Sequence, residues 1–182
     1  MKVTLVRHLA LLVEPGVCYG LDTLMHPDRE ADADRLGADS IFTHAVHIWS
    51  SPAARCLTIA ERIQRNLGIP LTVDHRLREI DFGDWTGLKW EEIGREEIDR
   101  WAASPLTFGP PGGETGAALR ARVQEFHDEL HRDGRDCVVV SHGGPLKILG
   151  SMIEGVPIDL LTPSPALGSV RQLNLKAPVP QA

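Results

Sequence analysis

The chain has 182 residues, a length typical of a single domain. With 42% hydrophobic and 24% charged residues, it can bury a core and lacks the composition of a disordered chain. Its formal net charge of −6 argues against nucleic acid or an anionic membrane as the main partner, because both attract a basic surface. A small anionic ligand remains compatible, since it needs only a local cluster of Arg and His.

Targeting and disulfide signals are missing from the sequence. The three cysteines are far apart and follow no zinc-binding spacing, and their odd number does not suggest a disulfide framework. The first apolar run is short and ends at Arg7, unlike a signal peptide. No stretch approaches the roughly 18 apolar residues of a transmembrane helix. We therefore expect one domain over residues 1–182, located in the cytoplasm.

The N-terminal half shows a strand, a loop, a strand and a helix. The β-branched run from Lys2 to Val6 predicts a buried strand that ends at Arg7-His8. Residues 9–27 contain Pro-Gly and Tyr-Gly pairs without a regular period, which indicates a loop. A second strand is expected at residues 48–50. The following helix starts near residue 53 and ends at the Gly at position 68.

The middle of the chain predicts a short strand at residues 71–73. Apolar side chains in residues 88–103 recur at near-helical spacing, and residues 105–113 form a rigid loop with three prolines and three glycines. A strongly amphipathic helix follows and ends at Asp133-Gly134. Its apolar stripe comprises Leu119, Val123, Phe126 and Leu130.

The C-terminal third begins with a fully apolar run from Cys137 to Val140, typical of a central parallel strand. The run passes through Ser141-His142-Gly143-Gly144 into another helix. A last strand is expected at residues 170–175, and residues 178–182 form a loose end. Strands alternating with helices predict a three-layer α/β/α sandwich with a mostly parallel central sheet.

Two segments share one design, an apolar strand that leads to a histidine and a turn. They end in Arg7-His8 and in Ser141-His142-Gly143. Because ligands bind beyond the carboxyl ends of parallel strands, both histidines would face one crevice if their strands are neighbours. The glycines after His142 allow close backbone approach, and the N-terminus of the next helix attracts an anion.

Basic and acidic side chains complete a candidate phosphoryl site. Arg55 lies in the first turn of its predicted helix, where its guanidinium could bind two phosphate oxygens. Together with Arg7 and the two histidines, it would surround a phosphoryl group. Transfer also needs a proton donor to the leaving oxygen. Glu79 and Asp81 are both candidates, and the chemistry alone does not choose between them.

The chain resembles the histidine phosphatase superfamily, which includes the cofactor-dependent phosphoglycerate mutases. Five ordered blocks carry the resemblance and cover residues 3 to about 150: VRH at 6–8, SSPAARCLTIA at 50–60, LREIDFGDWTG at 77–87, PGGET at 111–115 and VVVSHGG at 138–144. The resemblance implies a phosphoglycerate mutase-like fold that needs no metal or organic cofactor. It also implies a small phosphorylated substrate, and a homodimer is kept open as the oligomeric state.

The resemblance also assigns roles to residues. His8 would attack phosphorus and become a phosphohistidine, while Arg7, Arg55 and His142 would bind the phosphoryl oxygens. Glu79 falls on the family's acid position and would protonate the leaving oxygen. His8, Glu79 and His142 are thus the expected catalytic residues. The expected substrate-binding residues are Arg7, Arg55, Tyr19, Gly20 and Gly143.

One departure from the family pattern follows the nucleophile. The first motif usually continues Arg-His-Gly-Glu-Thr, whereas Leu9-Ala10-Leu11 follows His8 here, which puts the packing around the phosphate pocket in question. The segment from Pro15 to Gly20 resembles a block of the α-ribazole phosphatase branch, which acts in cobalamin assembly. That branch makes α-ribazole 5′-phosphate the leading substrate hypothesis.

Two alternatives remain beside a phosphomonoester hydrolase. A phosphoglycerate mutase-type enzyme is disfavoured, because such enzymes are longer and carry extra basic residues for a second anionic group. Residues 84–115 supply only Lys89, Arg95 and Arg100. A phosphate-binding domain with weak or no turnover is the second alternative. The altered Leu9-Ala10 makes it conceivable, and the intact histidines, arginines and Glu79 argue against it.

Overall fold

A computed structural model describes residues 1–20 and 23–176 of the protein. Its centre is a five-stranded sheet in the order β3-β2-β4-β1-β5. The strands are β1 (Lys2–Arg7), β2 (His47–Ser50), β3 (Leu71–Val73), β4 (Cys137–Ser141) and β5 (Val170–Asn174). Four of them are parallel, and β5 pairs antiparallel with β1 at one edge. The predicted strands and the mostly parallel sheet are confirmed.

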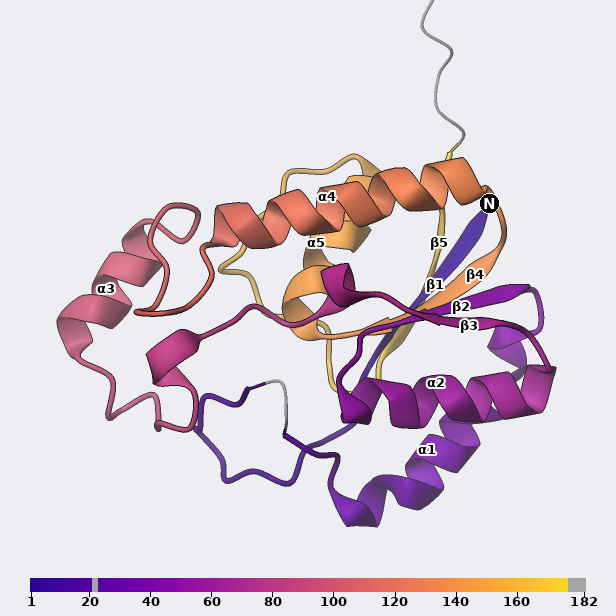
Figure 1. The fold of residues 1–182 in the computed structure, drawn as a ribbon, viewed down its shortest axis with the longest axis horizontal. Coiled ribbons are helices and arrows are strands. Elements are labelled where there is room, and N and C mark those ends of the chain that lie inside the picture. The colour runs from indigo at the N-terminus through magenta and orange to yellow at the C-terminus, as the bar shows by residue number, and fades with distance from the viewer. Residues whose placement is uncertain (21–22, 177–182) are drawn as a thin grey trace, which may run out of the picture.

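Helices cover both faces of the sheet (Figure 1). They are α1 (Glu30–Gly37), α2 (Ala54–Leu67), α3 (Arg95–Ala103), α4 (Gly116–Asp133) and α5 (Gly143–Glu154). In Figure 1, α4 and α5 lie above the sheet and α1 and α2 below it, while α3 stands apart at the left. This arrangement is the three-layer sandwich expected from the alternation of strands and helices.

Alternating strand residues build a core on each side of the sheet. Val3, Leu5 and Val139 pack with α4 and α5, whereas Val6 and Val140 pack with α2. Such alternation follows from the pleat, which points successive side chains to opposite faces. Both faces are therefore apolar, which explains why the central strands read as continuous apolar runs.

The helix expected within residues 88–103 occupies only its last part, because α3 begins at Arg95. The backbone of residues 88–90 bonds to the N-terminal loop instead of forming a helix. Cys18 N donates to Leu88 O at 2.8 Å, and Trp90 N donates to Gly16 O at 2.9 Å. The prediction was therefore wrong for residues 88–94, since tertiary backbone hydrogen bonds outweigh the helical spacing of their side chains.

Helix α1 was not predicted, because few of its residues are apolar and only Ala33 and Gly37 are buried. It is attached to α2 by Arg62, whose Nε donates to Asp34 Oδ1 at 2.7 Å and which also pairs with Glu30. Within the described part of the chain, no helix is long and apolar enough to cross a bilayer. The expected loose end at residues 178–182 lies outside the described residues, and the single-domain assignment stays a prediction.

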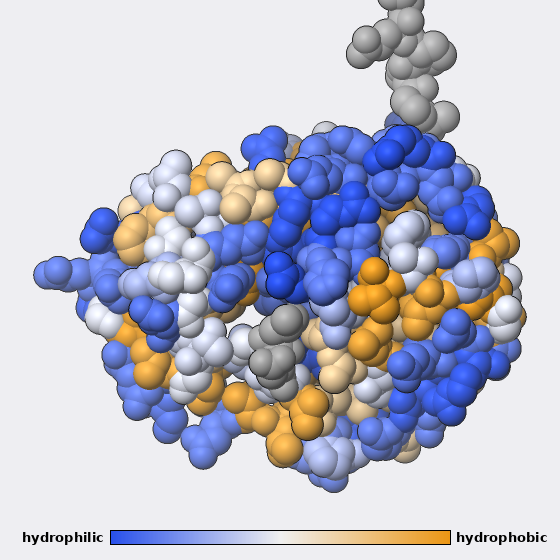
Figure 2. Space-filling view, in the orientation of Figure 1, coloured by the Kyte–Doolittle hydropathy of each residue, from blue (hydrophilic) through white to orange (hydrophobic). Residues whose placement is uncertain are grey.

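Figure 2 shows a hollow in the surface between α3 and the main body of the molecule. A third apolar cluster supports the α3 side of this region. Its buried members are Cys18, Trp85 and Ile93, with Trp101 and Phe82 packed against them. The segment from residue 82 to 108 thus carries its own small core beside the sheet.

Candidate active site

Two histidines meet at the carboxyl ends of neighbouring parallel strands. Arg7 of β1 pairs in register with Ser141 of β4, so His8 and His142 leave the sheet side by side. Both side chains are fully buried, and their ring centroids are 5.2 Å apart. The condition set by the sequence, that the two strands be neighbours, is met. The two rings therefore meet at the edge of the sheet where such folds bind ligands.

The hydrogen bond at His8 Nδ1 defines the tautomer of this ring. Nδ1 lies 2.8 Å from Leu9 O, and a carbonyl only accepts, so Nδ1 carries the proton. Nε2 then has a lone pair, and it is buried without a hydrogen-bond partner among the described residues. The pKa of His8 is lowered to about 3, mainly by burial. The hydrogen bond to Leu9 O acts in the opposite direction and raises the pKa, whereas the positive charges of Arg55 and Arg7 lower it. The ring is therefore neutral, with a lone pair directed away from its anchor.

His142 is held as the opposite tautomer. Arg55 Nη2 lies 3.2 Å from His142 Nδ1, and because a guanidinium only donates, this nitrogen accepts. Nε2 therefore carries the proton and donates to Ser51 Oγ at 2.8 Å. Burial lowers the pKa of His142, and the positive charge of Arg55 adds to this effect. The ring is neutral and fixed at both nitrogens.

Sequence reasoning missed Ser51 as a site residue. Ser51 is fully buried and lies 91 positions before the histidine it binds. Ser51-Pro52 reads as the start of a helix, which is the usual meaning of Ser at this place. The sequence feature that could have identified Ser51 is its position directly after the second predicted strand, because side chains at strand ends lie near the expected ligand site. Cys56, with Sγ 3.6 Å from His142 Nε2, packs against the same ring.

Both arginines contact Tyr19. Arg55 is fully buried, its Nη1 donates to Gly20 O at 3.1 Å and to Thr23 O at 3.0 Å, and its guanidinium lies 5.6 Å from the Tyr19 ring. Arg7 donates from Nη2 to Tyr19 Oη at 3.3 Å and from Nη1 to Pro165 O. The loop residues Tyr19 and Gly20 thus hold the guanidinium groups beside the two histidines.

Glycines bring the N-terminus of α5 close to these groups. A Cβ on Gly143 would lie 2.7 Å from Ser164 Cβ and 3.2 Å from Arg7 Cζ, so a larger residue would collide with the site. The free N–H groups and the positive dipole end of a helix suit an anion at this position. Ser164 and Arg7 thus lie close to the backbone of Gly143, and its expected role in binding substrate stays a prediction.

Glu79 is the carboxylate that reaches this helix end. Its Oε1 accepts from Ile80 N at 3.1 Å and from Gly144 N at 3.2 Å. Burial raises the pKa of Glu79, opposed by these hydrogen bonds and by Arg7. Asp81, in contrast, is exposed and accepts from Gly83 N at 2.9 Å within its own turn. Of the two carboxylates that chemistry left open, Glu79 therefore has the environment of a proton donor.

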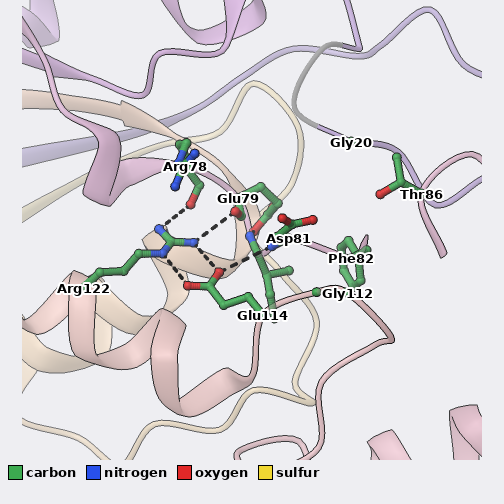
Figure 3. Close-up of a pocket in the computed structure, with 11 residues that line it drawn as sticks. Gly20, Arg78, Glu79, Asp81, Phe82, Thr86, Gly112, Glu114 and Arg122 are labelled. Carbon is green, nitrogen blue, oxygen red and sulfur yellow. Dashed lines mark hydrogen bonds and ion pairs between the residues drawn. The ribbon is translucent and has the colours of Figure 1, made fainter. Parts of the chain in front are cut away.

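A cavity of about 390 Å³ adjoins Glu79 and Gly20 (Figure 3). Arg122 of α4 holds its wall, since it pairs with Glu114 at 2.8 Å and donates to Arg78 O at 2.6 Å and Glu79 O at 3.0 Å. The charge of Arg122 is thus balanced by Glu114, as Figure 3 shows. The other lining residues are Ile80, Asp81, Phe82, Thr86, Gly112 and Gly113.

The residues after His8 that depart from the family pattern are accommodated by the loop before β5. A Cβ on Gly168 would lie 2.7 Å from Leu9 Cδ2, so the glycine leaves room for the leucine. Leu9 packs against the core on the α2 side, and Gly168 N donates to His8 O at 3.0 Å. Ala10 O accepts from His26 N at 2.9 Å. Because the backbone carbonyl of Leu9 anchors His8, the departure leaves this anchor intact.

The assembled groups suit a phosphoryl group. Guanidinium groups and a helix N-terminus bind its oxygens, a neutral imidazole offers a lone pair, and a carboxyl with a raised pKa can donate a proton. Among the described residues, no group of three or more His, Cys, Asp or Glu side chains could hold a metal ion.

Comparisons with known proteins place these groups in context. A model of the histidine phosphatase superfamily (branch 1) matches residues 4–177. Phosphoserine phosphatase 1 of Hydrogenobacter thermophilus is 29% identical over 168 residues, which cover 87% of this chain and 79% of that protein. Glucosyl-3-phosphoglycerate phosphatase of Mycobacterium tuberculosis is 26% identical over 184 residues, covering 90% and 81%. The structure of the α-ribazole phosphatase from Shigella flexneri has a TM-score of 0.86 at 21% identity, covers 96% of this chain and 90% of that one, and shows the shared fold.

Proposed function

We propose that this chain, which belongs to the histidine phosphatase superfamily and is a phosphatase of that type, hydrolyses a phosphomonoester through a phosphohistidine on His8. The observation that carries the proposal is the state of His8. Its Nδ1–H is bound to Leu9 O, while its Nε2 is buried and lacks a partner among the described residues. A neutral imidazole with a free lone pair beside two arginines is an activated nucleophile for phosphorus.

The first step forms the His8 Nε2–phosphorus bond and breaks the bond from phosphorus to the alcohol oxygen. Arg7 and Arg55 stabilise the charge on the phosphoryl oxygens, as does the N-terminus of α5. Because Arg55 Nη2 donates to His142 Nδ1, His142 positions this guanidinium for the phosphoryl group. The Glu79 carboxyl gives its proton to the departing oxygen, so the alcohol leaves neutral.

The second step returns the enzyme to its starting state. The Glu79 carboxylate takes a proton from water, and the resulting hydroxide attacks the phosphohistidine. The phosphorus–nitrogen bond breaks, inorganic phosphate leaves, and Glu79 is again protonated. Ile80 N and Gly144 N hold the carboxyl in place through both steps, because both donate to Oε1 and Gly144 N also lies 3.5 Å from Oε2.

Our leading substrate hypothesis is α-ribazole 5′-phosphate, whose hydrolysis would be a step of cobalamin assembly. The cavity beside Glu79 supports an alcohol half without a second strong negative charge. Arg122 is neutralised by Glu114, and Asp81 lies in the same wall. Arg78 also lines the cavity, so its basic side chains are balanced by Glu114 and Asp81 and leave no excess positive charge for a second anionic group, which disfavours 3-phosphoglycerate and therefore a mutase. Phosphoserine and glucosyl-3-phosphoglycerate are alternative substrate hypotheses, because similar proteins are named as phosphatases of these compounds.

The test is an assay of phosphate release and of the covalent intermediate. Wild type and His8→Ala are incubated with p-nitrophenyl phosphate, α-ribazole 5′-phosphate, phosphoserine, glucosyl-3-phosphoglycerate and 3-phosphoglycerate. Rapid quenching at alkaline pH preserves an acid-labile phosphohistidine for detection. His131→Ala, a change of a histidine on α4 away from the two strand ends, serves as the matched control.

We expect phosphate release and a labile phosphoprotein in wild type and His131→Ala, and neither in His8→Ala. The highest kcat/KM is expected for α-ribazole 5′-phosphate. Phosphate release that survives in His8→Ala would refute the mechanism. Isomerisation of 3-phosphoglycerate without phosphate release would favour the mutase, and no turnover with any substrate would favour a binding domain. The cytoplasmic location and the homodimer stay predictions, which fractionation and sedimentation test.

A further inference from the structure

A second cavity, of about 340 Å³, is lined by residues of α5 and β5 and reaches Arg7. Its floor is Leu5 of β1 with Leu146 of α5, and the loop before β5 covers it through Pro163 and Pro165. The remaining lining residues are Arg7, Lys147, Ser151, Ser164, Ser169 and Arg171. The proposed reaction uses only one of these side chains, Arg7.

The charges of this cavity are of one sign. Arg7, Lys147 and Arg171 line it, and no acidic side chain is among the described residues that do so, although the chain carries a net charge of −6. Arg171 is neutralised by its pair with Glu154, which does not line the cavity, so Arg7 and Lys147 supply the net positive charge. Asp159 and Glu79 are the acidic groups whose charges act on Lys147. Such a concentration of positive charge attracts an anion.

The cations are spaced along the cavity. Arg171 pairs in register with Leu5, and Arg7 follows two residues later on the same face of β1. Two strand residues span about 7 Å, so the two arginines stand at separate ends of the apolar floor. Lys147 donates from Nζ to Leu160 O at 2.9 Å and to Thr162 O, and an ammonium has a third N–H to give.

Arg7 connects this cavity with the phosphoryl site. Its Nη groups bind Tyr19 Oη and Pro165 O, while its Nε is buried without a hydrogen-bond partner among the described residues. A buried donor that lacks an acceptor is costly, and an anion in the cavity would supply one. The same guanidinium would then serve two anions, one on each side.

We propose that the cavity between α5 and β5 binds a small organic acid with two carboxylates on a short carbon chain, and that this occupant inhibits the enzyme through Arg7. Its carboxylates bind Arg7 with Lys147 and Arg171, and its carbon chain packs on Leu5 and Leu146. The bound anion accepts a hydrogen bond from Arg7 and reduces the positive electrostatic potential of its guanidinium. The affinity of the active site for the phosphoryl group therefore falls. Because coupling between two sites is reciprocal, phosphate in the active site also weakens binding of the acid.

Succinate is the probe, and the neutral succinamide of the same length is its control. Hydrolysis of p-nitrophenyl phosphate is followed at constant ionic strength with each compound, and succinate binding is measured by calorimetry. Two variants alter the cavity without touching the phosphoryl site. Ser151→Leu fills it from α5, and Arg171→Leu removes one cation. Arg132→Leu, an exposed arginine paired with Glu129 on α4, is the matched control.

We expect succinate to raise the KM for p-nitrophenyl phosphate by about three- to tenfold, and this increase should reach a plateau once the cavity is saturated. The reason is repulsion between two anions that bind near the same cation. Succinamide has no effect, and Arg132→Leu behaves as wild type. Ser151→Leu and Arg171→Leu keep the basal kcat/KM and lose both the inhibition and the calorimetric binding. The proposal is overturned if succinate does not bind, or if its inhibition is purely competitive without a plateau and persists in Ser151→Leu. Calorimetric binding does not depend on turnover, so it separates this inference from the proposed function.

Discussion

Gly144→Ala perturbs the proposed proton donor while leaving the rest of the site in place. Gly144 lies in the first turn of α5, where its N–H binds Glu79 Oε1 at 3.2 Å. An added Cβ would lie 2.5 Å from the same oxygen and 3.4 Å from Leu119 Cδ2. The carboxyl would therefore have to move, whereas Leu119 would remain in contact.

The size of the effect follows from this distance. An ordinary Cβ contact begins near 3.4 Å, so the carboxyl must retreat by about 0.9 Å. A misplacement of about 1 Å can cost a reacting group roughly 10²-fold in rate. The fold should not suffer, because Ala is more favourable than Gly in a helix by about 0.5–1 kcal/mol. We expect a loss of activity without a loss of stability.

The assay compares two leaving groups. p-Nitrophenolate is stable without a proton, so hydrolysis of p-nitrophenyl phosphate should fall little, whereas hydrolysis of an alkyl phosphate should fall by about 10²-fold. Gly150→Ala in the same helix is the matched control, because its Cβ would meet no atom closer than 3.6 Å. An equal loss on both substrates, or no loss on either, would refute the role of Glu79 as proton donor.

The other predictions concern the histidines and the altered motif. Ser51→Ala leaves the buried Nε2–H of His142 without its acceptor, so we expect kcat/KM to fall about ten- to a hundredfold. Unchanged kinetics would exclude the assigned tautomer of His142. Leu9→Gly should lower the free energy of unfolding by about 1–3 kcal/mol in denaturant titration while the folded protein stays active, because the backbone carbonyl still anchors His8. The pKa of His8 falls from 6.5 to about 3 on folding, so the unfolded chain binds more protons and stability declines as pH falls from about 6.5 toward 3. Urea titration at pH 7 and pH 5 should show a smaller decline for His8→Asn than for wild type; equal declines would contradict the buried neutral state.

Local patterns identified most of the fold. The β-branched and apolar runs that became β1 and β4 are buried on both faces, so their composition alone marks them as central strands. Helix α2 begins one residue after the expected start and ends at Gly68, whose φ of +68° suits a glycine. Such signals are encoded within a few neighbouring residues and need no knowledge of distant contacts.

The failure at residues 88–94 has the opposite origin. The helical spacing of Trp90 and Ile93 is genuine, yet Ile93 is buried beside Trp85 and the exposed Trp90 meets Trp85 edge to face, while the backbone bonds to residues 16–18. A hydrogen-bonded partner 70 to 74 positions away leaves no trace in the local period. Burial and backbone pairing were therefore decided by the tertiary structure.

The site divides in the same way. The sequence by itself determined which chemistry is present, since the residues of the Arg7-His8 and His142-Gly143 motifs and the family they indicate can be read directly. Only the tertiary structure decided the working state of these groups. The proton on His8 depends on the carbonyl of Leu9, and that on His142 depends on Arg55 and Ser51. Tautomers and pKa values follow from hydrogen-bond partners and burial, which exist only once distant segments have packed together.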